Sequence, residues 1–109
     1  MLDITKEELQ KELQGTDLLV LDFYGPTCGP CKKIVPLLEE FEKKNTKGVK
    51  FFKVNAFDQF EICKDYGVSA LPTLLFIKHH RERARVLFQD MTRQNIATLI
   101  AELRDGILD

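Results

Sequence analysis

Cys28 and Cys31 are the residues of this chain whose types and spacing can do chemistry. Two thiols that lie one helical turn apart can form and break an internal disulfide, so a Cys-x-x-Cys pair is typical of a redox dithiol. The apolar run 18–23 precedes the pair and an amphipathic segment follows it, which indicates a junction between a strand and a helix. Pro30 favours a helix that begins at Gly29 or Pro30, because the first turn does not need the N–H that proline lacks.

The position of Cys28 at the start of this helix predicts a reactive thiol. Unsatisfied N–H groups and the helix macrodipole favour a negative charge there. A free cysteine has a pKa near ~8.5 and is mostly a thiol at neutral pH, whereas the thiolate is the nucleophile. A lowered pKa would therefore let Cys28 attack a disulfide, and Cys31 is close enough to resolve the mixed disulfide that results.

Asp22 is the second residue with a chemical signature, since it is a carboxylate within the otherwise apolar segment 18–23. Burial disfavours the ionised form, so it is expected to raise the pKa of Asp22 toward the working pH, as a proton acceptor requires. The alternative is an aspartate at a strand end whose side chain reaches solvent or a backbone N–H.

A metal site is the alternative interpretation of the cysteine pair. Zinc usually takes four ligands, and the chain has no second Cys-x-x-Cys motif. His79 and His80 could supplement Cys28 and Cys31, although the sequence does not bring their loop to the cysteines. The third cysteine, Cys63, is expected to be a small buried hydrophobe, and the alternative is a surface thiol open to oxidation or intermolecular pairing.

Alternating helices and strands must position these residues. The predicted strands are 18–24, 49–55, 73–78 and a weaker 84–88, the last two joined through the loop 79–83. The first predicted helix begins with a capping box of Thr5 and Glu8 and ends at Gly15. The second runs from residue 29 or 30 to the polar run 43–48 and is expected to kink at Pro36. The later ones are a short helix at 59–66 capped by Gly67 and a final helix from about Thr92. This order predicts a mixed sheet with helices on both faces.

Composition and charge indicate one soluble domain, residues 1–109. The chain has 44% hydrophobic residues and a net charge of -1, so it can form one core and has no overall attraction to nucleic acid or membrane. The basic run 78–85 is expected to be a solvated hairpin, because it lacks aromatic residues that stack on bases, and docking on an acidic partner is the alternative. Residues 1–8 lack the pattern of a signal peptide, and no apolar run approaches the ~20 residues of a membrane span. Three cysteines do not form the disulfide framework of a secreted protein. A reducing, cytoplasmic compartment is expected.

Several motifs resemble those of thioredoxins in order and spacing across nearly the whole chain. They are Leu21-Asp22-Phe23-Tyr24, Cys28-Gly29-Pro30-Cys31-Lys32, Pro36, Lys53-Val54-Asn55 and Gly67-Val68-Ser69-Ala70-Leu71-Pro72-Thr73. The resemblance implies an α/β thioredoxin fold, with a central mixed sheet in the order β-α-β-α-β-α-β-β-α and helices on both faces. It also implies a protein-disulfide reductase of cytosolic redox homeostasis and electron transport that binds no cofactor and no metal. Its partners would be disulfide-containing proteins and a thioredoxin reductase that recycles it with NADPH, and the protein is expected to be a monomer.

The resemblance assigns a role to each residue of the redox site. Cys28 would be the exposed nucleophile and Cys31 the buried resolving thiol. Asp22 would take the proton from Cys31, through water, and Lys53 would pair with Asp22 and modulate it. Gly29 and Pro30 would tune the redox chemistry. For Lys53 the alternative is a side chain that extends to the sheet edge.

The resemblance also implies a substrate-binding surface, from which this chain departs. Leu71 would bind substrate main chain by strand addition before a cis Pro72, the alternative being an ordinary trans proline that starts a strand. Thr27 and Tyr24, also assigned to this surface, stand where thioredoxins usually carry tryptophan. Glycines usual in the family are missing after Lys78 and at 88–90. Because of these departures, the resemblance does not establish which partner proteins bind.

Two other functions compete with the reductase. A disulfide oxidase or isomerase usually has histidine in place of Pro30 and works in an oxidising compartment, so Pro30 favours the reductase. A thioredoxin-fold interaction module would dock a partner, with incidental redox activity, and the altered substrate surface favours that alternative.

Overall fold

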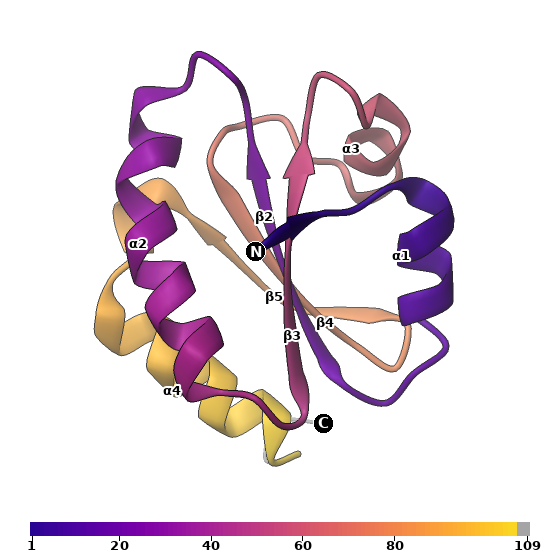
Figure 1. Cartoon of the computed structure of the whole chain (residues 1–109), viewed down its shortest axis with the longest axis vertical. Helices are drawn as coiled ribbons and strands as arrows, with labels where there is room; N and C mark the ends of the chain where they lie inside the picture. The colour runs from indigo at the N-terminus through magenta and orange to yellow at the C-terminus, as the bar shows by residue number, and fades with distance from the viewer. Residues whose placement is uncertain (107–109) are drawn as a thin grey trace.

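The computed structural model describes residues 1–106 and confirms the predicted mixed sheet (Figure 1). Five strands lie in the order β1-β3-β2-β4-β5, with α2 and α4 on one face and α1 and α3 on the other. The strands are β1 (Leu2–Asp3), β2 (Leu18–Tyr24), β3 (Val49–Asn55), β4 (Thr73–Lys78) and β5 (Arg81–Leu87). The helices are α1 (Lys6–Glu12), α2 (Gly29–Lys44), α3 (Phe60–Tyr66) and α4 (Arg93–Arg104), with a short 3-10 turn, η1 (Phe88–Asp90), before α4.

β2 is the central strand, parallel to β3 and antiparallel to β4. Leu18 and Val20 face the core under α2 and α4, whereas Leu19, Leu21 and Phe23 face the core under α1 and α3. A strand covered on both faces has no solvent side, which explains its almost continuous apolar run.

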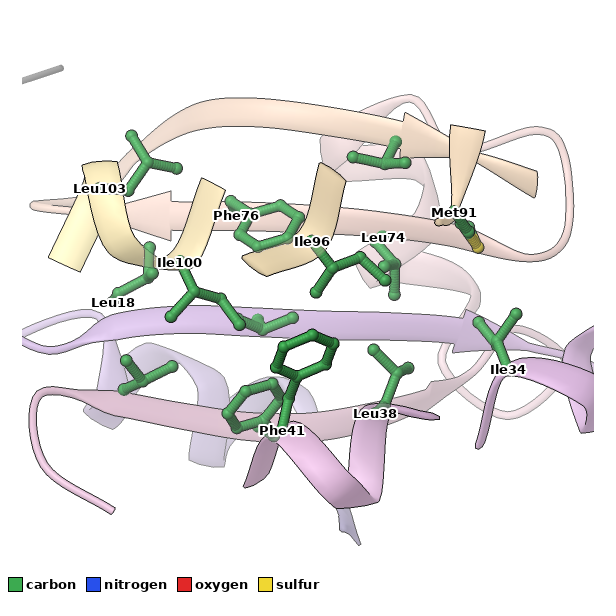
Figure 2. Close-up of a cluster of buried hydrophobic side chains, with 14 residues drawn as sticks. Leu18, Ile34, Leu38, Phe41, Leu74, Phe76, Met91, Ile96, Ile100 and Leu103 are labelled. Atoms are coloured by element: carbon green, nitrogen blue, oxygen red, sulfur yellow. The ribbon is translucent and has the colours of Figure 1, made fainter. Parts of the chain in front are cut away.

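The core under α2 and α4 holds α2 in place (Figure 2). Ile34, Leu38 and Phe41 project from α2 into the same buried cluster as Ile96 and Ile100 of α4. This packing confirms the predicted apolar stripe of α2, and the helix runs through Pro36 to Lys44. Because α2 begins at Gly29, the same packing fixes where Cys28 and Cys31 lie.

Two predicted helix caps are present. The Thr5 hydroxyl accepts the Glu8 N–H at 3.2 Å, and the Glu8 carboxylate accepts the Thr5 N–H at 2.9 Å, which completes the capping box of α1. Gly67 ends α3 with a φ of +63°, a left-handed conformation that favours glycine.

The predicted boundaries of the last hairpin were wrong. β5 begins at Arg81, and the turn contains His79 and His80 alone, with φ of 53° and 65°. A two-residue turn with positive φ at both positions matches the twist of antiparallel strands, and it needs no longer loop. β5 lies at the sheet edge and its first residues are charged and largely exposed, so hydrophobic alternation did not reveal them.

The basic run is also not simply a solvated hairpin. Lys78 is only 8% exposed, and its ammonium donates to the carbonyls of Leu103 at 2.7 Å and Arg104 at 3.1 Å. The Arg85 guanidinium donates to the Gly67 carbonyl at 3.1 Å, at the end of α3. Cations at these positions satisfy terminal carbonyls and complement the negative end of a helix dipole. Within the described part of the chain, no helix is long and apolar enough to cross a membrane.

A Lys78→Met variant is expected to lower the free energy of unfolding by about 1–3 kcal/mol, because buried carbonyls of α4 lose their donor. Lys50→Met is the matched control. Lys50 forms a partly exposed ion pair with Glu12 at 2.8 Å, and such pairs contribute about 1 kcal/mol or less. Urea unfolding of both variants measures the difference, and equal losses would show that the contact with α4 is unimportant.

Candidate active site

A disulfide joins Cys28 to Cys31 at the N-terminus of α2, as the spacing predicts. Cys28 is the N-cap residue, with extended backbone, and its sulfur accepts the N–H of Cys31 at 3.2 Å. Pro30 lies in the first helical turn. This hydrogen bond pairs one of the unsatisfied N–H groups at the helix N-terminus with the sulfur of Cys28. The same arrangement stabilises a thiolate at that position.

The two cysteines differ in accessibility. Cys28 is half-buried and its neighbours Gly29 and Pro30 are exposed, whereas Cys31 is 2% exposed. Cys28 is therefore the more accessible of the two cysteines to an incoming disulfide. This asymmetry is what an attacking thiol and a resolving thiol require.

Asp22 lies inside the protein with 1% of its surface exposed, so the alternative of a solvent-reaching aspartate is wrong. Alternation along β2 puts it on the same face as Leu18 and Val20, toward α2. There it stands in register with Lys53 of β3 and Leu74 of β4. Both carboxylate oxygens lack a hydrogen-bond partner among the described residues. Burial raises the pKa of Asp22 to about 7, against the opposing charge of Lys53.

Lys53 makes its salt bridge with a residue that the sequence did not suggest. Its ammonium lies 3.9 Å from the Asp3 carboxylate and 5.4 Å above the centroid of the Tyr24 ring. The Tyr24 hydroxyl donates to the other Asp3 oxygen at 2.6 Å, and burial together with this bond raises the pKa of Tyr24 to about 12. Lys53 makes no hydrogen bond to Asp22, and its positive charge opposes the rise in the pKa of Asp22 from the neighbouring strand.

A pocket of about 190 Å³ brings several of the predicted residues together. Tyr24 and Lys53 line it on the sheet side, and Pro26 and Cys31 line it on the side of α2. A space of this size can hold water beside Cys31, although Asp22 does not line it.

The Leu71–Pro72 peptide bond is cis, which confirms the expectation from the resemblance. Leu71 is half-buried and lies next to Gly25, since a Cβ atom on Gly25 would be 3.2 Å from its Cδ1 atom and 3.9 Å from the Cβ of Cys28. The turn therefore lies beside Cys28. Thr27, which precedes Cys28, is exposed.

The remaining candidates lie outside this site. Cys63 is a free thiol, 8% exposed, and burial raises its pKa, so the prediction of a small buried hydrophobe is confirmed. β4 begins beside Phe23 and runs to the opposite end of the sheet, which places His79 and His80 far from Cys28. The zinc alternative that used these histidines is therefore wrong. Residues 1–106 contain no group of three or more metal-ligating side chains.

Phe57 lies at the site although the sequence did not indicate it. Phe57 is 70% exposed, and its Cε1 atom would lie 3.4 Å from a Cβ atom on Gly25. A large aromatic residue in a polar segment directly after a strand was the signal that could have indicated it.

Comparisons with known proteins agree with this geometry. The family model "Thioredoxin" matches residues 1–102. Thioredoxin H4 of Arabidopsis thaliana is 36% identical over 76 residues, which cover 70% of this chain and 64% of that protein. Thioredoxin-1 of Saccharomyces cerevisiae is 35% identical over 83 residues, which cover 76% of this chain and 80% of that protein. The structure of Fasciola hepatica thioredoxin superposes with a TM-score of 0.82 at 30% identity, covering 93% of this chain and 96% of that one. With its redox pair at the start of α2, this chain belongs to the thioredoxin family of thiol-disulfide oxidoreductases.

Proposed function

We propose that this protein reduces protein disulfides through Cys28 and Cys31. The observation that carries the proposal is the pairing of an accessible Cys28 with a buried Cys31 at the start of α2. The Cys28 thiolate attacks one substrate sulfur, forms a mixed disulfide and releases the other sulfur as a thiol. Cys31 then attacks the sulfur of Cys28, closes the internal disulfide and releases the second thiol. Two electrons and two protons pass from the dithiol to the substrate.

In this proposal Asp22 takes the proton that Cys31 loses. A base with a pKa of about 7 can accept a proton at neutral pH and release it again. The side chain faces α2, its oxygens have no hydrogen-bond partner among the described residues, and the pocket beside Cys31 has room for water. Substrate main chain would bind along Leu71, before the cis Pro72, by strand addition.

The oxidised protein must be reduced again by a two-electron donor. We propose a flavin-dependent thioredoxin reductase that uses NADPH, in a reducing, cytoplasmic compartment. Proline at position 30, where oxidases and isomerases usually carry histidine, supports the reducing direction.

Insulin reduction tests the proposal directly. The protein is expected to accelerate the precipitation of insulin chains above the rate with dithiothreitol alone, and to accept electrons from NADPH through a thioredoxin reductase. A redox titration is expected to give a potential near the ~-270 mV of thioredoxin, whereas a value of ~-120 to ~-180 mV would support an oxidase or isomerase. Absence of any acceleration, with tight partner binding by a Cys28→Ser, Cys31→Ser variant, would favour an interaction module.

A further inference from the structure

An aromatic side chain stands exposed at a fixed position beside the redox pair. Phe57 follows the end of β3 and exposes 70% of its surface. Its N–H donates to the side-chain oxygen of Asn55 at 3.0 Å, and the Gln59 N–H donates to the Asn55 carbonyl at 2.8 Å. These bonds close a turn on Asn55 and hold in place the backbone that carries the ring.

The ring reaches the active site through a glycine. A Cβ atom on Gly25 would lie 3.4 Å from the Phe57 ring, 3.2 Å from the Leu71 side chain and 3.9 Å from the Cβ of Cys28. The side chains of Phe57, Leu71 and Cys28 therefore all lie close to Gly25, which has no side chain of its own. Both apolar side chains lie next to Gly25, close to Cys28, and a larger residue at position 25 would displace them.

In a bound substrate, the residue next to the attacked cysteine would lie against the side chains of Phe57 and Leu71. A substrate strand along Leu71 has residues about 3.3 Å apart, so the residue next to the attacked cysteine stays within a few ångströms of Cys28. The ring itself is 70% exposed, so most of it is open to a substrate side chain. An apolar substrate side chain would bury part of Phe57, whereas a polar one would lose water without gaining a partner.

We propose that Phe57 is a specificity-determining residue that selects disulfides whose reactive cysteine has an apolar neighbour, which the ring and Leu71 hold beside Cys28. The inference rests on the proposed reductase function. In this proposal Phe57 acts on the recognition of the substrate, and the small disulfide used below as a control reports any change in the thiol chemistry itself.

Two disulfide peptides that differ only in leucine or serine beside one cysteine test the proposal. The rate constant of the reduced protein with each peptide is measured by stopped flow. The wild type is expected to prefer the leucine peptide about tenfold, which corresponds to about 1.4 kcal/mol. Phe57→Ser is expected to lower the rate with the leucine peptide by about tenfold and to change the rate with the serine peptide by less than about twofold. Phe57→Leu is expected to keep most of the preference.

Phe60→Ser is the matched control. Phe60 is 68% exposed, and it lines a different pocket together with Lys6 and Glu7. Its replacement is expected to change the rate with neither peptide. Hydroxyethyl disulfide, which is too small to span Cys28 and the ring, should react equally with all variants. If the wild type reduces neither peptide, the reductase function fails. If it reduces both and Phe57→Ser keeps the leucine preference, or behaves as Phe60→Ser does, only the role of Phe57 is overturned.

Discussion

A Cys28→Ser variant is expected to lose disulfide reduction by at least about a thousandfold, because a serine hydroxyl does not ionise at neutral pH and cannot form a mixed disulfide. Cys31→Ser removes only the second step. It is expected to accumulate the mixed disulfide between Cys28 and the substrate, since no second thiol displaces it.

Cys63→Ser is the matched control for both variants. Cys63 lies in the core under α1 and α3, away from the redox pair, so its replacement is expected to leave the rate of reduction near that of the wild type. The insulin assay measures turnover, and non-reducing electrophoresis with mass spectrometry detects the trapped substrate. Wild-type turnover in Cys28→Ser would contradict the assignment of the nucleophile. Trapping by Cys31→Ser in a cell extract would also identify the partners.

Asp22→Asn is expected to stabilise the protein at alkaline pH relative to the wild type. The Asp22 carboxyl has a pKa of about 7 in the folded state and an ordinary value of 3.8. Below the ordinary value the carboxyl is protonated in both states, so it has no effect on stability. As the pH rises toward 7 the unfolded state releases the proton first, which destabilises the folded state progressively. Above pH 7 the full penalty is present, roughly 4 kcal/mol for a shift of about three pKa units.

Urea unfolding at about pH 5 and about pH 8 measures this effect. Asparagine cannot ionise, so the stability of the variant relative to the wild type is expected to rise by roughly 2 kcal/mol between these two conditions. Comparing the two conditions cancels the constant cost of burying the amide. Asp65→Asn is the control, because Asp65 is exposed and its ion pair with Lys6 contributes little. A difference that does not change with pH would show that Asp22 does not titrate between these values.

The same variant separates stability from activity. If Asp22 accepts the proton of Cys31, Asp22→Asn slows the release of the mixed disulfide while the initial attack by Cys28 keeps its rate. The protein would then be more stable and a slower reductase, which is the trade-off expected of a buried titratable group that is kept for function.

The buried strands and the amphipathic helices could be predicted because each follows a local rule. β2 shows an almost continuous apolar run because both faces are covered, and α2 repeats apolar residues at helical spacing because one face is covered. β5 could not be located in the same way. An edge strand with largely exposed residues has little apolar pattern, and the two left-handed histidines that shorten its turn have no strong sequence signature.

Cys28 and Cys31 could be identified as a dithiol at a helix start from their spacing and from Pro30, and Asp22 as a buried acid from its apolar neighbours, because these properties depend on residues a few positions apart. Contacts between distant segments were decided only by the tertiary structure. Lys53 turns to Asp3 on the edge strand β1, and Lys78 caps a helix that ends 26 residues later, at Arg104. Phe57 lies near Gly25, and so near Cys28, because β2 pairs with β3. An isolated exposed or buried side chain looks the same in a sequence, and packing alone distinguishes the two.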